Sequence, residues 1–382
     1  MHVELLELIN FRSYERAQLP LSVGVNVLLG PNGQGKTNLV EAVEYLATLH
    51  SHRVASDTPL VHVDQQQAVI RAEVVGGLDD PRRLLVEVEI NAGRPNRARI
   101  NRAGLPRTRD VIGAVRTVAF SPEDLAIVKG DPADRRDFLD TLVITRWPRM
   151  AGVKADYERV LRQRTTLLKS LAGRSYRPSG SQGADALDVW DAQLASLGGQ
   201  VIAARLQTLA DLVPYTRQAY QTIAPVNNEV SATYRSGTEL DGATDPVGIA
   251  DALLAQMRAR RQEEIARAVS LVGPHRDDLT LGIGSLPARG YASHGESWSL
   301  ALALRLGSLA LLRADGLEPV LILDDVFAEL DQPRRERLAS RIITAEQVLV
   351  TAAVGAELPS ALVGPRYEVS LGCVQAVEVV DD

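Results

Sequence analysis

The chain has 382 residues, of which 45% are apolar and 24% charged, so it falls in the ordinary globular range and is long enough for two or three lobes. Its formal charge of −6 excludes a uniformly basic nucleic-acid binder but allows a local basic surface. The single cysteine excludes an intramolecular disulfide, and no apolar run is long enough for a membrane span. Glu4, Glu7 and Arg12 stand where a secretory signal would need an apolar run, so we expect a cytoplasmic protein.

The first part of the chain, residues 1–120, is predicted to contain short strands and one helix. Residues 25–29 form a strand that leads into a glycine-rich loop, and residues 36–49 form the helix that follows. Alternating apolar and polar residues over 68–75 and 84–90, followed by RARI and the turn NRAG, predict an antiparallel sheet. We expect this part to be the first half of a nucleotide-binding head.

The middle part, residues 121–272, is predicted to be helical. Apolar residues recur at helical spacing over 153–171 and 194–212, and a turn-rich segment, 172–183, separates the two stripes. A third helix is expected over roughly 247–272. A first stripe of about 19 residues would span only about 28 Å, which predicts a short arm.

The last part, residues 273–382, returns to alternating strands and helices. Strands are expected over 278–283, 319–323 and 347–350, helices over 295–313 and 333–343, and two further strands at the end. The order α/β, helical, α/β indicates an α/β head, with a mixed sheet and an antiparallel β patch, that is split by a helical insertion lobe.

Residues 30–37 have the spacing G-x-x-x-x-G-K-[ST] of a phosphate-binding loop. The strand before it and the amphipathic helix after it argue against a chance glycine-rich turn. Lys36 is expected to reach the β- and γ-phosphates of ATP, and the Thr37 hydroxyl to bind Mg²⁺. The predicted ATP contacts are Gly30, Pro31, Asn32, Gly33, Gln34, Gly35, Lys36 and Thr37.

A phosphate-binding loop of this kind also needs an acid at the end of a neighbouring apolar strand. The candidate is VLILDD, in which Asp324 lies 288 positions (324 − 36) after Lys36. Asp324 is predicted to hold Mg²⁺ through its water shell, and Asp325 to orient the attacking water, so Asp325 and Lys36 are the predicted catalytic residues. The alternative, a plain acid at a strand end, is stronger for Asp325, because Asp324 could already meet the needs of the metal.

Between these motifs, SHGESW (293–298) precedes an apolar helix, and the acidic turn Glu329-Leu330-Asp331 follows VLILDD. A Ser-x-Gly sequence at a helix start suits anionic oxygens, although alone it would be interpreted as a serine cap with a glycine turn.

In this order, the motifs resemble ABC-type ATPase heads of the SMC kind, and within them the RecF family of bacterial recombinational repair proteins. The resemblance is carried by LELINFRSY (6–14), GPNGQGKTN (30–38), FSPEDLAIVKGDPADRRDFLD (120–140), GPHRDDL (273–279), SHGESWSLALALRL (293–306) and LDDVFAELD (323–331). It implies an ATP-dependent homodimer in which Ser293, Gly295 and Glu296 of one head contact the γ-phosphate held by the other. Asp331 would lie at the subunit seam. It also implies RecR and RecO as partners that help load recombinase at gaps.

Three departures from the general ABC pattern bear on the rate of hydrolysis. The signature reads SHGES where transporters have LSGGQ, Asp325 stands where many relatives have Glu, and Thr351 stands where transporters place a histidine. An aspartate is shorter by one methylene and should hold the attacking water less well. We therefore expect a slow, DNA-stimulated ATPase that serves as a switch.

Six arginines lie in RPNRARINRAGLPRTR (94–109), a stretch that contains no acid. On a strand–turn–strand they could bridge phosphates of duplex DNA without reading its sequence. A solvated hairpin edge protected by charge is the alternative. Aromatic residues make up only 4% of the chain, which disfavours stacking on single strands, so we expect duplex DNA near single-strand junctions. The predicted DNA contacts are Arg94, Arg97, Arg99, Arg102, Arg107 and Arg109.

Rival functions are a structural SMC-like DNA scaffold without a repair-loading role, a P-loop phosphotransferase and a nuclease with an ABC head. Short arms and the absence of a hinge argue against the scaffold, and a phosphotransferase has no obvious use for the signature and the ELD turn. A nuclease would need another acidic metal cluster, for which Asp277 and Asp278 are a thin substitute. Arg53 is a further candidate that could approach the nucleotide base.

Overall fold

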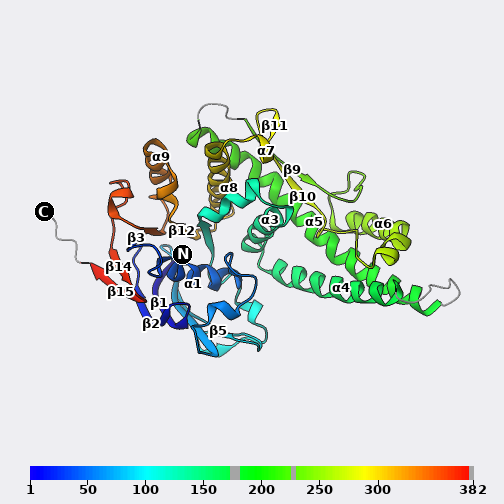
Figure 1. Ribbon diagram of the computed structural model, residues 1–382, viewed down its shortest axis with the longest axis horizontal. Helices are drawn as coiled ribbons and strands as arrows, with labels where there is room; N and C mark the ends of the chain where they lie inside the picture. Colours follow the sequence, from blue (N-terminus) through cyan, green and yellow to red (C-terminus); the bar gives the residue numbers. More distant parts are fainter. Residues whose placement is uncertain (173–180, 225–228, 378–382) are drawn as a thin grey trace. The chain divides into compact units, whose positions relative to one another are not determined.

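The computed structural model describes residues 1–172, 181–224 and 229–377, which form two compact units (Figure 1). The first unit takes its described residues from 1–125, 215–224 and 294–377, and the second takes the remainder. The predicted turn-rich segment, 172–183, lies largely outside the described residues. The lobe boundaries predicted at residues 120 and 272 stay predictions.

One sheet of the first unit is antiparallel, with strand order β2-β1-β4-β5-β6-β7. Its strands are β1 (His2–Phe11), β2 (Tyr14–Pro20), β4 (Gln67–Gly77), β5 (Asp80–Asn91), β6 (Arg97–Ile100) and β7 (Ala103–Gly104). The predicted strands over 68–75 and 84–90 and the RARI hairpin are confirmed. The sheet is larger than predicted, because β1 pairs with both β2 and β4.

The other sheet is mixed, with order β15-β14-β3-β13-β12-β8. Its strands are β3 (Gly24–Leu29), β8 (Thr117–Phe120), β12 (Val320–Asp324), β13 (Gln347–Ala352), β14 (Arg366–Ser370) and β15 (Cys373–Val377). Neighbours from β8 to β14 run parallel, and β15 is antiparallel to β14. The central strands are buried on both faces, as their continuous apolar runs require.

Helix α1 (Lys36–Thr48) contacts strands of both sheets and joins them into one hydrophobic core. Two further helices of this unit are α8 (His294–Ala314) and α9 (Gln332–Ile342), which confirms the helices predicted over 295–313 and 333–343. The short 3₁₀ helices are η1 (Thr58–Leu60), η2 (Thr108–Val111), η3 (Pro122–Asp124), η4 (Val326–Glu329) and η5 (Gly355–Glu357).

The second unit contains helices and a small antiparallel sheet. The helices are α2 (Leu125–Lys129), α3 (Pro132–Arg146), α4 (Arg149–Ala172), α5 (Ser181–Ile223), α6 (Pro246–Arg267) and α7 (Ala288–Tyr291), of which α2 begins and α5 ends in the first unit. The sheet has order β11-β10-β9, with β9 (Val230–Arg235), β10 (Asp278–Ile283) and β11 (Leu286–Pro287). The prediction of helix throughout 121–272 is therefore wrong for β9, whose residues VSATYR alternate in burial and pair with β10.

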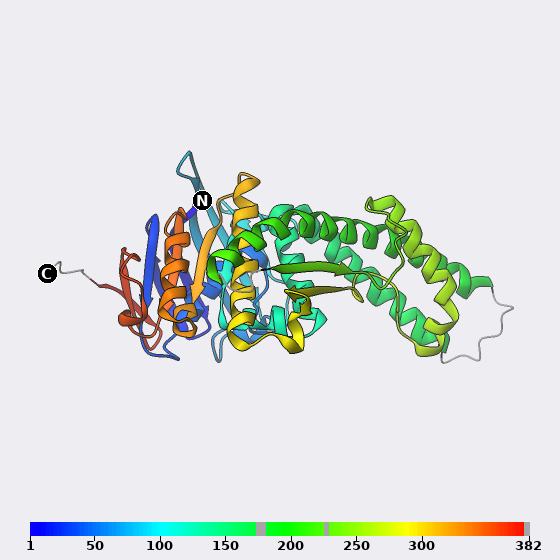
Figure 2. The same ribbon diagram turned by 90° about the horizontal axis from the view of Figure 1, so that it is seen from above.

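Helix α4 packs against α6 within the second unit (Figures 1 and 2), and both contribute to a core with α5. With 24 residues, α4 is about 36 Å long, somewhat longer than the predicted stripe. A fully buried guanidinium ties the three helices together: Arg164 donates to Asp191 at 2.6 Å and to Glu264 at 2.5 Å. Removal of one partner from such a pair typically costs about 3–5 kcal/mol, because the remaining charge stays buried.

Candidate nucleotide-binding site

The predicted phosphate-binding loop connects the end of β3 to the start of α1. Gly30 has φ of 156°, and a Cβ atom there would collide with the backbone carbonyl of Val369 on β14, so the loop can pass this strand only with glycine. Lys36 is buried, and its ammonium donates to the carbonyls of Gly30 at 2.7 Å and Pro31 at 3.2 Å. These partners are neutral, so the buried positive charge is suited to a phosphate group.

The predicted metal ligands meet where β3, β12 and β13 end at the same edge of the sheet. Asp324 on β12 stands opposite Thr351 on β13, and its Oδ1 accepts hydrogen bonds from Thr351 at 2.6 Å and from Thr37 at 3.1 Å. Burial raises the pKa of Asp324 to about 6, and the charge of Asp325 adds to the rise. A divalent cation would favour the charged form, so a threonine hydroxyl beside a buried carboxylate fits Mg²⁺.

Asp325 turns out of the strand in a left-handed conformation, with φ of 51°. Its backbone N–H donates to the Thr351 hydroxyl at 2.9 Å, so Thr351 touches both acids at the strand end. The side chain of Asp325 lines a cavity of about 170 Å³ together with Asn32, Gly33, Gly35, Lys36, Thr37, Asn38 and Arg53. Of the loop residues predicted to contact ATP, Gly30, Pro31 and Gln34 do not line this cavity, and the Gln34 side chain accepts from the N–H of Leu371.

Arg53 lies at the cavity through contacts that sequence reasoning did not find. Its guanidinium donates to Asn38 at 2.9 Å and to Glu41 at 3.2 Å. Glu41 has a fully buried side chain and accepts two further bonds from Arg12, at 2.6 and 2.9 Å. Arg12 belongs to the LELINFRSY segment, but nothing in the local sequence indicates that its partner is Glu41 on α1.

The signature and the ELD turn lie at the starts of two helices. Ser293 directly precedes α8, and Glu296 is in its first turn. Asp331 caps α9, accepting from the N–H of Arg334 at 3.0 Å. Gly295, Glu296 and Asp331 are not among the described residues that line the nucleotide cavity.

An ion pair between a half-buried arginine and a buried aspartate connects α8 to the edge of the mixed sheet. Arg305 on α8 donates to Asp124 at 2.6 Å and 3.1 Å. Asp124 ends η3, which follows β8, and β8 lies parallel to β12 with Phe120 opposite Leu323. The loop after β8 therefore emerges at the edge that carries Asp324. Both Asp124 and Arg305 lie in segments named by the sequence pattern, but their pairing was not predicted.

The predicted DNA-contacting arginines do not form one free basic stripe. On the antiparallel sheet, Glu7, Arg71, Glu87 and Arg99 stand opposite one another on successive strands, and Arg99 pairs with Glu87. Arg97 is exposed and stands opposite Glu89, with a closest approach of 4.0 Å. Thus β5 supplies the acids that the stretch itself lacks. Arg94, Arg102 and Arg107 are exposed, and Arg109 is half-buried.

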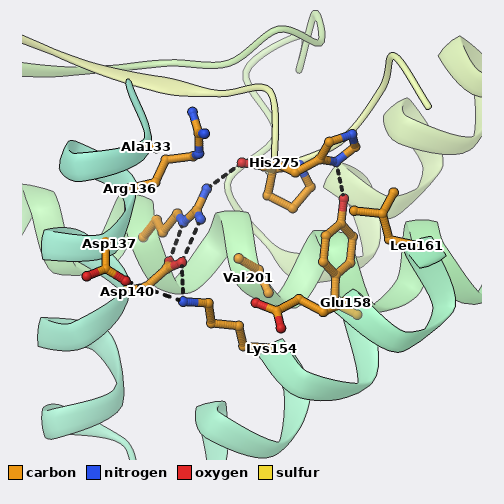
Figure 3. A pocket seen from close by; sticks show the side chains of 12 residues that line it. Ala133, Arg136, Asp137, Asp140, Lys154, Glu158, Leu161, Val201 and His275 are labelled. Carbon is orange, nitrogen blue, oxygen red and sulfur yellow. Dashed lines mark hydrogen bonds and ion pairs between the residues drawn. The ribbon is translucent and has the colours of Figure 1, made fainter. Parts of the chain in front are cut away.

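A second cavity, of about 230 Å³, lies in the second unit beside the GPHRDDL segment (Figure 3). Asp140 accepts two bonds from Arg205, at 2.7 and 2.9 Å, and lies 3.2 Å from Lys154. The Tyr157 hydroxyl lies 2.7 Å from His275 Nδ1, and burial lowers the pKa of His275 to about 4. His275 is therefore neutral at physiological pH. Arg205 on α5 donates to the Pro274 carbonyl and Arg136 on α3 to the Asp277 carbonyl, so the GPHRDDL segment is fixed against α3, α4 and α5.

The described residues contain neither a membrane-spanning helix nor a cluster of metal-binding side chains. Within them, no helix has the length and apolar character needed to span a membrane. No group of three or more His, Cys, Asp or Glu side chains in these same ranges is placed to hold a metal ion, and this includes the surroundings of Asp277 and Asp278.

Comparison with known proteins gives one consistent result. Residues 2–361 match the RecF/RecN/SMC N-terminal domain family. "DNA replication and repair protein RecF" of Cutibacterium acnes is 57% identical over the full length of both chains. The protein of the same name from Streptomyces avermitilis is 55% identical over 99% of this chain and 100% of its own.

Solved structures agree with these matches. A structure of the recombination mediator protein RecF with ATP is 26% identical, covers 98% of this chain and 97% of its own, and has a TM-score of 0.89. The Smc head domain from Pyrococcus furiosus, 15% identical over 98% of this chain and 96% of its own, has a TM-score of 0.54 and shares the fold. The predicted fold class, an SMC-type ATPase head split by an insertion, is thereby confirmed. On the full-length matches to its relatives, this chain belongs to the RecF family.

Proposed function

We propose that this chain is a slow, DNA-stimulated ATPase of recombinational repair that dimerises on ATP and binds duplex DNA near single-strand gaps. In this proposal it helps load recombinase with RecR- and RecO-type partners, and hydrolysis resets the dimer. Support comes from relatives named for DNA replication and repair, and from a related RecF structure with ATP that is named for the RecFOR pathway.

The observation that carries the proposal is that the signature and the ELD turn do not line the nucleotide cavity, which we interpret as two half-sites of the first unit. One half is the cavity beside Lys36 and Asp325. The other half comprises the starts of α8 and α9, which carry Gly295 and Asp331 and are not among the residues lining that cavity. Helix starts with free backbone N–H groups attract anions. Two copies facing each other would bring the second half of one to the first half of the other.

In the proposed site, each residue of the chain has a distinct task. Lys36 binds the β- and γ-phosphates, while Thr37 and Asp324 hold Mg²⁺, which when bound neutralises charge on the phosphates. Asp325 accepts a hydrogen bond from the attacking water and orients it. Thr351 keeps both acids in place through the contacts described above. The short side chain of Asp325 is the reason to expect slow turnover.

Sedimentation with ATP tests the dimer. Lys36→Arg should weaken ATP-dependent association, because a planar guanidinium does not fit where the ammonium contacts two carbonyls. Asp325→Asn should retain nucleotide and accumulate as a dimer, since water is no longer activated. Adding duplex DNA should favour association in the wild type. If Asp325→Asn stays monomeric at saturating ATP, the two-copy scheme is wrong.

A further inference from the structure

The guanidinium of Arg334, on α9, lies against the signature glycine at the start of α8. A Cβ atom on Gly295 would lie 3.5 Å from Nη1 and 3.6 Å from Nη2 of Arg334, so the guanidinium covers this backbone closely. Its Nη1 also donates to Asp331 at 3.2 Å, and 29% of the side chain remains exposed. Arg334 therefore connects the signature to the ELD turn within one unit, and its side chain is partly exposed.

The charge of Arg334 is placed where a cation is unfavourable on its own. It sits at the start of α8 and in the first turn of α9, and both positions carry the positive end of a helix dipole. Asp331 offsets part of this charge, and Glu296 lies in the first turn of α8. An anion bound at this spot would be attracted by the guanidinium and by the helix ends together.

A buried hydroxyl is influenced by the charges of Glu296 and Arg334. Tyr220, near the end of α5, is fully buried, and its hydroxyl has no hydrogen-bond partner among the described residues. Burial and the charge of Glu296 raise its pKa, whereas the charge of Arg334 acts in the opposite direction. The charges of Glu296 and Arg334 therefore both act on the interior beside the end of α5.

The position of Arg334 outside the nucleotide cavity of its own chain bears on which anion it could bind. Arg334 does not line the nucleotide cavity of its own chain, which is bounded by the phosphate-binding loop, Asn38, Arg53 and Asp325. Two neighbouring N–H groups of a guanidinium match the oxygens of a phosphate. We propose that Arg334 binds the terminal phosphate of the ATP held by a second copy of this chain. This inference rests on the proposed ATP-dependent dimer and adds a residue outside the S-x-G-E and ELD motifs.

The first test measures association directly. In the Asp325→Asn background, Arg334→Gln should weaken ATP-dependent dimerisation by about 10- to 100-fold in sedimentation, the loss expected for a charged hydrogen bond. The dimer affinity of Arg334→Lys should lie between that of Arg334→Gln and that of the parent protein, because an ammonium keeps the charge without the paired N–H groups. Binding of a fluorescent ATP analogue to dilute monomers should be unchanged. Arg341→Ala, an exposed arginine on the same helix, is the control and should dimerise normally.

Mixing two variants shows whether Arg334 acts across the boundary. A Lys36→Ala copy cannot hold ATP but keeps Arg334, and an Arg334→Gln copy holds ATP but lacks the arginine. If Arg334 acts in trans, labelled Lys36→Ala should associate with Arg334→Gln more tightly than the labelled double variant Lys36→Ala, Arg334→Gln does, since each of these two mixed pairs holds one ATP. If the arginine serves its own nucleotide, mixing gives no gain and the inference is overturned.

The outcomes separate this inference from the proposed function. Normal dimerisation of folded Arg334→Gln, with an unchanged circular dichroism spectrum and melting temperature, would refute the role of Arg334 and leave the dimer intact. Failure of the parent Asp325→Asn protein to dimerise with ATP would remove the proposed function and this inference together.

Discussion

The buried acid at the end of β12 should make the nucleotide-free protein less stable at neutral pH. The pKa of Asp324 is raised from 3.8 to about 6, chiefly by burial, and the side chain is 6% exposed. Roughly two pKa units correspond to about 3 kcal/mol. Between pH 4 and 6 the folded protein holds a proton that the unfolded chain has released, so stability falls as pH rises. Above pH 6, the folded state carries the full destabilisation of about 3 kcal/mol from the buried, charged Asp324.

Asp324→Asn removes this titration and should therefore stabilise the protein, while it disrupts the proposed magnesium site. The gain in the free energy of unfolding should be near zero at pH 4, grow toward pH 6 and reach up to about 3 kcal/mol at pH 8. Urea unfolding in EDTA without nucleotide would measure it. Trp298 lies in the first unit, whereas Trp147 and Trp190 lie in the second, so a Trp147→Phe, Trp190→Phe background reports on the first unit alone.

Glu41 in the same unit is the matched control, with the opposite sign. Burial opposes its charged form, but hydrogen bonds from Arg12 and Ser51 and the nearby positive charges outweigh burial, so its pKa is lowered. A lowered pKa stabilises the fold above the unfolded pKa and loses that effect in acid. Glu41→Gln should thus destabilise the protein at pH 8. An equal gain for Asp324→Asn at pH 4 and pH 8, or no gain at pH 8, would refute the reasoning.

Three further predictions follow from the site and its surroundings. Gly30→Ala should lower the urea midpoint more than Gly33→Ala. Both alanines strain a backbone with positive φ, but only the first also meets the Val369 carbonyl, since the second faces open space, so equal losses would contradict this. Asp124→Asn leaves Arg305 without its buried carboxylate and should lower the free energy of unfolding by about 1–3 kcal/mol. In a double-mutant cycle, the double variant that carries Asp124→Asn and Arg305→Met should recover part of this loss. Arg94→Gln and Arg102→Gln should each reduce the slope of log K for duplex DNA against log salt concentration by up to about 0.9. Arg99→Gln should change this slope little, because Glu87 already pairs with Arg99. A larger change for Arg99→Gln than for the other two would show that the ion pair opens on DNA.

Most of the correct predictions from the sequence rest on local residue patterns. The phosphate-binding loop, the strand ending in Asp324 and the helix after the signature were found because each is a continuous segment with its own spacing or periodicity. Their joint arrangement was inferred from family order, and the structure places Thr37 and Asp324 in hydrogen-bond contact.

Contacts between distant segments could not be found in this way. Glu87 faces Arg99 only because β5 pairs with β6 in a given register, which the stretch 94–109 does not encode. Strand β9 was missed because it is short and its partner, β10, follows 43 residues later (Asp278 after Arg235). The approach of Arg334 to Gly295 depends on how α8 and α9 pack, and no motif spans both.

Strand β3, at residues 24–29, has as its sheet neighbours β13 and β14, which are made more than 300 residues later (Gln347 after Leu29). During synthesis at about 5–20 residues per second, the apolar strand and the glycine-rich loop must wait tens of seconds for these partners. The head therefore completes its folding only when its last strands have left the ribosome. Until then, a nascent chain exposes the hydrophobic edge of β3. Truncation of the final strands should therefore destabilise β3 and the phosphate-binding loop, near the other end of the chain.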